Sequence, residues 1–273
     1  MGFVTILVTG ATGTVGRELV GQLARSGERV RALTRDPAGA NLPAGVEVVR
    51  GDLTDAASLV PALAGVTGLH LITFGGDEPL GNGAEIVALA TAARVRRVSV
   101  LSGWDPSSVE AALAAGDLPW TLLRPVEFMA NALDLAESIR ADGVVRTFDL
   151  GRPSAMVHEA DIAAVAAVAL TQDGHGGMTY ALTGPQALTL EQKLATIGAA
   201  VGREVRFVPL TEEEFRRRLR DSYLPEEYIE FAVELEKNPP GVGMVVDPTV
   251  EKVTGRPART FAQWVSEHAD AFR

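Results

Sequence analysis

Short apolar runs alternate with alanine-rich, helix-forming stretches along the first two-thirds of the chain. Six runs have the length and composition of strands, and several are apolar almost throughout, as strands covered on both faces are: Val4–Thr9, Arg29–Thr34, Val46–Arg50, Thr67–Thr73, Arg97–Leu101 and Trp120–Leu123. Between them lie helical patterns at Val15–Arg25, Ala56–Leu63, Ala84–Ala93 and Ser108–Ala115. This alternation predicts βαβ units and a parallel sheet.

After Pro125 the alternation changes. The pattern predicts a helix at Glu127–Arg140, an extended run at Val144–Leu150, a helix at Glu159–Leu170, a strand at Met178–Leu182 and helices at Leu190–Val201, Glu212–Arg220 and Glu226–Glu236. The expected fold class is α/β, a Rossmann-type doubly wound parallel sheet with a smaller α+β C-terminal substrate lobe. We place the Rossmann domain at residues 1–150, completed by 156–184, and the lobe at 185–273 with parts of 126–155.

Composition narrows the function classes. The 273 residues are 47% hydrophobic, yet no stretch approaches the ~18 uncharged apolar residues of a membrane span. The first ten residues lack a basic start and read as a strand rather than a signal peptide, so we expect a cytoplasmic protein. No cysteine is present, which excludes disulfides and thiolate metal sites, and we predict no metal. The net charge of −10 argues against nucleic-acid binding.

The stretch VTGATGTVG places glycines at positions 10, 13 and 16, directly after the first apolar run. Gly10 allows the tight turn that leaves the strand, Gly13 lets the backbone approach a phosphate, and Gly16 lets the helix pack close to the sheet. The helix begins near Thr14, so its free N–H groups and positive dipole end face the ligand. We therefore predict a dinucleotide diphosphate site; a plain glycine-rich turn is the alternative.

The end of the second predicted strand, VRALTRDP, bears on the choice between NAD and NADP. A carboxylate there holds a ribose 2′-hydroxyl, whereas an arginine suits a 2′-phosphate. Arg35 follows Thr34 and offers a planar fork of donors, and Arg17 is a second cation in the first helical turn. Asp36 either competes for Arg35 or serves as a turn residue. We favour NADP(H), with a solvent-exposed strand-end charge as the alternative for Arg35.

The segment GDLTD at 51–55 follows the third strand. Asp52 is placed to accept a hydrogen bond from an adenine amino group, with Leu53 near the ring. A turn or helix cap is the alternative for Asp52, and more so for Asp55.

Taken together, these stretches and RRVSVLSG, LPWTLLRPVEFMAN and TGRPARTFAQWVSEH resemble the NmrA-like branch of the atypical short-chain dehydrogenase/reductases. The resemblance runs through nearly the whole chain, and LPWTLLRP followed by Phe128, Met129 and Asn131 is its strongest piece. It implies a Rossmann domain, a preference for NADP(H) and a substrate lobe built from C-terminal segments. Members include quinone reductases, other NAD(P)H-dependent reductases and redox-sensing regulators that bind cofactor without turnover.

The resemblance also implies a set of cofactor contacts. Those at the diphosphate are Gly10, Thr12, Gly13, Thr14, Val15 and Gly16. Thr34 and Arg35 lie at the 2′-phosphate, and Asp52 and Leu53 at the adenine. Residues after the next three strands border the ribose and nicotinamide: Thr73, Phe74, Gly75, Ser102, Gly103 and Pro125. Core packing is the alternative for Phe74.

The usual catalytic pair of short-chain reductases, Tyr-x-x-x-Lys, is missing, because the first tyrosine is Tyr180 and the first lysine Lys193. Glu110 fits the acidic position of the family's helix. Reduction nevertheless needs mainly a nicotinamide held against an acceptor, and a quinone or conjugated acceptor can take its proton from water.

We place five residues around the acceptor: Trp104, Glu127, Phe128, Asn131 and His158. Trp104 either stacks on a flat ring or packs at the surface. His158 is the one candidate proton donor, with helix entry as the alternative role. Glu127 binds substrate or favours a helix N-terminus.

Two functions fit these residues best. One is an NADPH-dependent reductase of a small aromatic, quinone-like or conjugated carbonyl compound. The other is an NADP(H)-sensing regulator with little or no turnover, motivated by the missing Tyr/Lys pair; a cofactor-assisted non-redox enzyme is a third. A homodimer is compatible with each.

Overall fold

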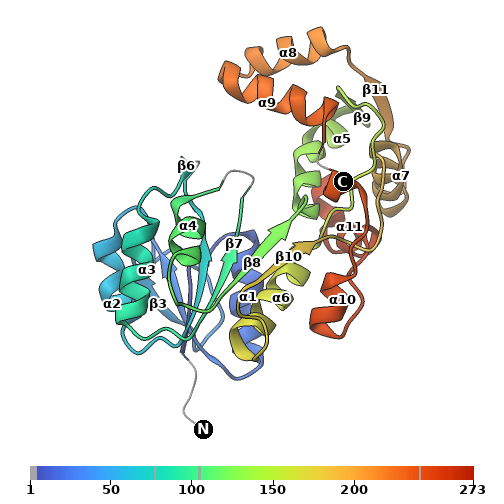
Figure 1. The fold of residues 1–273 in the computed structure, drawn as a ribbon. Coiled ribbons are helices and arrows are strands. Elements are labelled where there is room, and N and C mark those ends of the chain that lie inside the picture. The colour runs from blue at the N-terminus through green and yellow to red at the C-terminus, as the bar shows by residue number, and fades with distance from the viewer. Residues whose placement is uncertain (1–4, 77, 104–105, 240) are drawn as a thin grey trace. The chain divides into compact units, whose positions relative to one another are not determined.

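Seven parallel strands form one sheet in the order β10-β8-β7-β4-β1-β2-β3 (Figure 1). They are β1 (Thr5–Val8), β2 (Arg29–Thr34), β3 (Glu47–Arg50), β4 (Gly68–Ile72), β7 (Arg97–Leu101), β8 (Trp120–Pro125) and β10 (Met178–Leu182). The structure, a computed structural model, describes residues 5–76, 78–103, 106–239 and 241–273. Strand order runs outward in both directions from the β1–β4 pair, which confirms the doubly wound α/β class.

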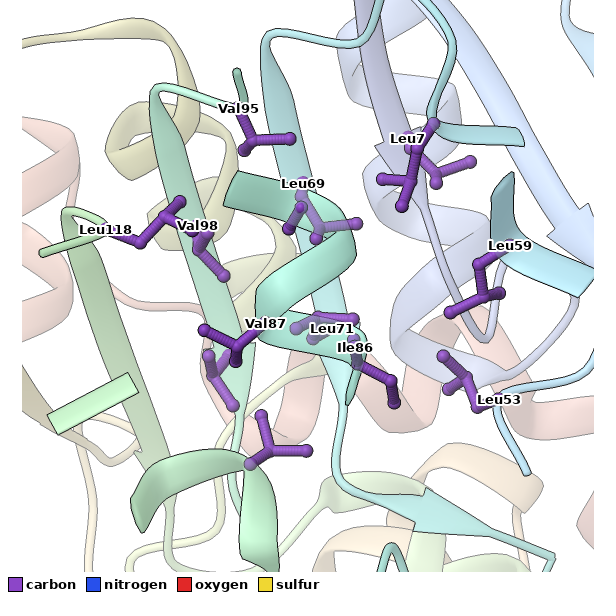
Figure 2. Close-up of a cluster of buried hydrophobic side chains, with 14 of the residues drawn as sticks. Leu7, Leu53, Leu59, Leu69, Leu71, Ile86, Val87, Val95, Val98 and Leu118 are labelled. Carbon is purple, nitrogen blue, oxygen red and sulfur yellow. The ribbon is translucent and has the colours of Figure 1, made fainter. Parts of the chain in front are cut away.

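Helices cover both faces of this sheet. On one face α1 (Thr14–Arg25) and α6 (Glu159–Thr171) pack against each other, and α6 reaches β4, β7 and β8. The other face carries η1 (Ala56–Ser58), α2 (Leu59–Leu63), α3 (Gly83–Ala92) and α4 (Ser108–Ala114). In the apolar cluster beneath them, Ile86 and Val87 of α3 meet Leu69 and Leu71 of β4 (Figure 2).

The alanine-rich pattern of α6 explains its central place. Ten of its residues are buried, because a helix that is apolar on nearly all sides must be covered all round. Its small side chains let α1 approach, and the amide of Gln22 donates a 2.8 Å hydrogen bond to the carbonyl of Ala160. The short helix α10 (Thr249–Thr254) also packs on α6.

The chain divides into two compact units. Unit 1 comprises Met1–Pro125, Glu159–Leu182 and Thr249–Arg256; unit 2 comprises Val126–His158, Thr183–Pro248 and Pro257–Arg273. We expected residues 156–184 to complete the sheet domain and parts of 126–155 to join the lobe, and unit 2 contains all of 126–158. β9 (Val144–Thr147) pairs there with β11 (Arg206–Pro209) in a separate small sheet. Unit 1 also gains α10 through its contacts with α6 and β10.

Unit 2 has its own aromatic core. Trp264 is fully buried and stacks on Phe261 and His268 at centroid distances of 5.8 and 4.2 Å, with Phe272 edge-on. The helices of unit 2 are η2 (Met129–Leu135), α5 (Ala136–Asp142), α7 (Leu190–Val201), α8 (Glu212–Asp221), α9 (Glu226–Lys237), η3 (Gly241–Met244), α11 (Phe261–His268) and η4 (Ala269–Phe272).

The helix predicted over residues 127–140 was partly wrong. Its first residues are extended: the N–H of Val157 donates to the carbonyl of Glu127 at 2.8 Å, and the N–H of Met129 to that of Val157 at 3.0 Å. Helical structure therefore begins at Met129 as a 3-10 turn and continues as α5 to Asp142. The sequence analysis also missed the short antiparallel pair β5 (Phe74–Gly75) and β6 (Glu78–Pro79).

Within the described residues, no helix combines the length and apolar character needed to cross a membrane.

His70 is a buried titratable residue on β4, and its Nδ1 lies 2.8 Å from the hydroxyl of Ser99 on β7. Burial lowers the pKa of His70 from 6.5 to about 4. Between these values the unfolded chain binds a proton that the folded chain does not, so the folded state loses stability as the pH falls.

We expect His70 to lower the free energy of unfolding by about 2 kcal/mol between pH 7 and pH 5, given ~1.4 kcal/mol for each pKa unit. Urea titrations of the wild type and of His70→Leu at both pH values measure the contribution of His70 to this change in the free energy of unfolding. A variant that loses as much stability as the wild type over this range would contradict the prediction.

Candidate functional site

The glycine turn between β1 and α1 closes in a way that only glycine permits. Gly10 has a φ of +59°, and its carbonyl accepts a 2.9 Å hydrogen bond from the N–H of Gly13. A Cβ on Gly16 would lie 2.0 Å from the carbonyl oxygen of Gly10, a distance that no side chain tolerates. Gly10 and Gly16 therefore allow the first turn of α1 to lie directly against the end of β1.

Gly13 is the N-cap of α1 and supplies no side chain to its first N–H groups. Four other helices, in contrast, begin with a Ser or Thr capping box, at Ser107, Thr189, Thr211 and Thr260. The first turn of α1 holds no acidic residue either. The positive end of the helix is thus left to an external anion, and the space that a Cβ would fill fits a cofactor diphosphate.

Arg17 supports this turn from inside. Its Nε donates to the carbonyl of Thr12 at 2.8 Å, and its Nη1 donates to those of Ala40 and Asn41 at 3.1 and 3.0 Å. Its guanidinium thus ties the glycine turn to the loop after β2. Assistance at the 2′-phosphate stays a prediction for Arg17.

The end of β2 resolves the role of Asp36. Its carboxylate accepts from the N–H of Ala38 at 3.1 Å and its own N–H donates to the hydroxyl of Thr34 at 3.2 Å, so Asp36 is a turn residue. Arg35 is exposed and forms no ion pair within the described part of the chain. The sequence analysis missed Arg50, which ends β3 in register with Thr34 and brings a second arginine to this edge.

Asp52 and Leu53 follow β3 and have different roles. One carboxylate oxygen of Asp52 accepts from the N–H and the hydroxyl of Thr54, at 2.9 and 2.8 Å. These hydrogen bonds, and to a lesser degree the charge of Arg35, lower the pKa of Asp52. Leu53 lies in the apolar cluster of Figure 2, and Asp55 caps η1. Adenine contact stays a prediction for Asp52 and Leu53.

The structure brings together the residues that end β4 and β7. The hydroxyl of Thr73 donates to the carbonyl of Leu101 and accepts from the N–H of Gly103, both at 3.3 Å. A Cβ on Gly103 would stand 2.1 Å from the ring of Phe74, so the ring covers this glycine. Hydrogen bonds within the fold explain the position of Thr73, and contact with Gly103 explains one side of the Phe74 ring. Contact of Thr73, Phe74, Gly75 and Pro125 with the nicotinamide half of the cofactor stays a prediction.

Ser102 anchors a small polar network at the end of β7. Its hydroxyl donates to Oε1 of Glu110 at 2.7 Å, and Oε2 of Glu110 accepts from the N–H and the hydroxyl of Ser107. Glu110 thereby completes the capping box of α4. The acidic position that we had matched to the family thus holds the strand end and the next helix in one arrangement.

Three residues that we predicted to bind the acceptor, Glu127, Phe128 and Asn131, lie near the start of unit 2, which begins at Val126. Oε2 of Glu127 lies 3.4 Å from Nζ of Lys193 and accepts from the hydroxyl of Ser154. Phe128 bridges to Val157 as a short parallel pair, and Asn131 is exposed on η2. Trp104 lies outside the described residues.

His158 is buried, and its Nε2 lies 3.3 Å from a carboxylate oxygen of Glu267 on α11. Proton donation stays a prediction for His158, and helix entry stays its alternative.

Lys193, Ser154 and Glu236 escaped the sequence analysis as candidate site residues. Lys193 precedes Leu194, whose side chain is buried in the core of unit 2. A lysine at the border of an apolar helix face is the signal that could have identified it. Ser154 and Glu236 carry no such signal, because their partners come from distant segments.

Two surface hollows occur in unit 2. One, of about 360 Å³, is lined by Ser138, Val144, Arg146, Leu210, Glu214 and Arg218. The other, of about 140 Å³, is lined by Asp149, Gly151, Thr189, Leu190, Glu191 and Phe207. Glu214 and Arg218 are engaged in structural hydrogen bonds, so we place no chemistry in the larger one. No group of metal-ligating side chains converges in the part of the chain that the structure describes.

The sheet, its switch in strand order and the glycine turn define a Rossmann-type dinucleotide-binding protein. Residues 4–252 match the NmrA-like family. A (4-alkanoyl-5-oxo-2,5-dihydrofuran-3-yl)methyl phosphate reductase of Streptomyces griseus is 41% identical, over 98% of this chain and 99% of the relative. An NAD(P)H azoreductase of Xenophilus azovorans is 36% identical over the same shares.

Among solved structures, the NADPH-dependent quinone oxidoreductase 2 of Escherichia coli, complexed with NADPH, is similar with a TM-score of 0.82. It is 29% identical, over 96% of this chain and 99% of that chain. The chain belongs to the NmrA-like family, and we assign it to the NAD(P)H-dependent oxidoreductases of this group.

Proposed function

We propose that the chain is an NADPH-dependent reductase that transfers hydride to a small conjugated carbonyl, quinone-like or aromatic acceptor. The observation that carries this proposal is the glycine turn, where an uncapped helix N-terminus faces space that any side chain at Gly13 would narrow. The reductases to which the chain is similar over its full length support the same reaction class.

In this proposal the chain's own residues bind and orient. The backbone N–H groups of Thr12, Thr14, Val15 and Gly16 hold the diphosphate, while Gly13 lets it approach the backbone. Arg35 and Thr34 hold the 2′-phosphate, and Asp52 with Leu53 borders the adenine. The ends of β4, β7 and β8 border the nicotinamide, and Glu127, Phe128 and Asn131 bind the acceptor. When bound, NADPH supplies the hydride, and one proton from solvent or a side chain completes the reduction.

The structure does not rebuild the missing Tyr/Lys pair from elsewhere in unit 1. The hydroxyl of Tyr180, on β10, lies 2.8 Å from Nδ1 of His175, and burial raises the pKa of Tyr180. Lys193 belongs to the other unit. We therefore propose acceptors whose reduction needs no strong side-chain acid, such as quinones and enones, over simple ketones.

The test is NADPH oxidation by the purified chain with a panel of quinones, enones and azo compounds, with NADH and simple ketones as matched comparisons. We expect turnover with at least one conjugated acceptor and a higher kcat/KM with NADPH than with NADH. Absence of oxidation across the panel would overturn the proposal.

The missing pair also favours a second candidate, an NADP(H)-sensing regulator. That function predicts tight cofactor binding, negligible turnover and recovery of a stable protein partner. Turnover by the isolated chain decides against it.

A further inference from the structure

A cluster of charged side chains within unit 2 lies outside the proposed cofactor contacts. Lys193, on α7, is 12% exposed, and its Nζ lies 3.4 Å from Oε2 of Glu127. The same oxygen accepts a hydrogen bond from the hydroxyl of Ser154. The chain has only three lysines; Lys237 is 42% exposed and Lys252 lies at the surface. Lys193 is thus the one lysine whose side chain is largely enclosed.

Lys193 has hydrogen-bonding capacity that Glu127 does not use. An ammonium carries three N–H donors, and strong charge-assisted bonds have lengths of about 2.7–2.9 Å. The 3.4 Å separation from Glu127 is a loose pairing by that measure. The remaining N–H donors of the ammonium are available to an oxygen atom of a ligand.

Two more carboxyl groups determine which kind of oxygen fits. Glu236, on α9, accepts a hydrogen bond from the N–H of Leu150 and feels the charges of Asp149, Glu127 and Lys193. Burial and then the charge of Asp149 raise the pKa of Glu236 to about 6. At pH 7 three carboxylates therefore accompany one ammonium. A phosphate or carboxylate would meet a net negative environment there, whereas a neutral carbonyl oxygen would not.

We propose that Lys193, positioned by Glu127 and Ser154, binds a neutral carbonyl oxygen of the acceptor. This inference rests on the proposed reductase function and specifies its substrate class. Nζ donates a hydrogen bond to this oxygen. Any phosphate on the same acceptor lies away from this cluster.

The first test measures binding rather than turnover. Dissociation constants for cinnamamide and 2-cyclohexen-1-one, both neutral carbonyl compounds, are determined by ligand-observed NMR on the full chain with NADP⁺ present. We expect about tenfold weaker binding in Lys193→Met, the loss of one charge-assisted hydrogen bond. Lys193→Gln, which keeps a donor but no charge, should fall in between, and the surface control Lys252→Met should match the wild type.

A purely structural ion pair makes a different prediction. It lowers the thermal midpoint equally in Lys193→Gln and Lys193→Met and leaves both dissociation constants unchanged. That result, or the absence of binding by the wild type, overturns the site. If Lys193→Met does not fold, the Gln variant alone decides. If the wild type binds these compounds through Lys193 but oxidises no NADPH, the binding site stands and the reductase function is overturned. If NADPH is oxidised at the same rate in the Lys193 variants, the reductase function stands and the site is overturned.

The second test uses pH. Cinnamate, an anionic counterpart of cinnamamide, should bind more weakly than the amide at pH 7.5. Its binding should tighten as the pH falls through 6, because the carboxylate of Glu236 becomes neutral there. In Glu236→Gln the dependence should disappear, with cinnamate bound equally at both pH values. If cinnamate binding tightens by the same factor in Glu236→Gln as in the wild type, the proposed effect of the Glu236 charge is overturned.

Discussion

Replacing Gly13 with alanine is expected to weaken NADPH binding by about 100-fold or more while the chain stays folded. The added Cβ would lie 3.2 Å from the carbonyl oxygen of Gly10, a contact that a shift of a few tenths of an ångström relieves. The methyl group, however, would occupy the space in front of the first N–H groups of α1. Losing two charge-assisted hydrogen bonds to phosphate, each worth about 1.5–3 kcal/mol, gives this magnitude.

Gly21→Ala is the matched control, since it makes the same substitution two turns along α1. Its Cβ would meet only the end of the flexible Arg25 side chain, at 3.2 Å, so binding should be retained. Isothermal titration of both variants, with circular dichroism as the folding check, measures the difference. Equal affinities for NADPH in the two variants would show that the turn does not hold the diphosphate.

Arg35→Ala is expected to reduce the affinity for NADPH by about 50-fold and to leave that for NADH unchanged. Arg35 is exposed and has no ion pair to lose within the described residues, although its charge acts on Asp52, and we propose that its guanidinium fork binds the 2′-phosphate. Arg50 lies beside Thr34 in the neighbouring strand, and adding Arg50→Ala should increase the loss further. Such discrimination between two cofactors is independent of any general loss of stability.

Arg96→Ala provides the comparison, because it removes the same charge from the opposite end of the strands, just before β7. Dissociation constants for both cofactors should match those of the wild type. If Arg35→Ala weakens NADH and NADPH alike, the arginine serves the fold or the diphosphate rather than the 2′-phosphate.

Local patterns were sufficient to predict the sheet and the cofactor turn. The apolar runs of β1, β4 and β7 and the glycines at 10, 13 and 16 each lie within a few residues, so spacing and propensity determine them. At two of these positions the structure shows why glycine is required: Gly10 has a positive φ, and a Cβ on Gly16 would collide with the backbone of Gly10.

Features that depend on distant partners could not be predicted in this way. The strand β9 pairs with β11, about 60 residues further along the chain, and both strands lie in unit 2. The hydrogen bonds from Arg17 to the carbonyls of Ala40 and Asn41 join residues 23 and 24 positions apart. Lys193 and Glu127 meet across 66 positions of sequence, and no local pattern signals such a pair.

Titration of the wild-type chain with NADPH and with NADH by calorimetry tests the central claim most directly. We predict one NADPH bound per chain, with an affinity clearly higher than that for NADH. Absence of heat with NADPH, NADP⁺ and NADH alike would contradict a dinucleotide site at the glycine turn, and the proposed chemistry with it.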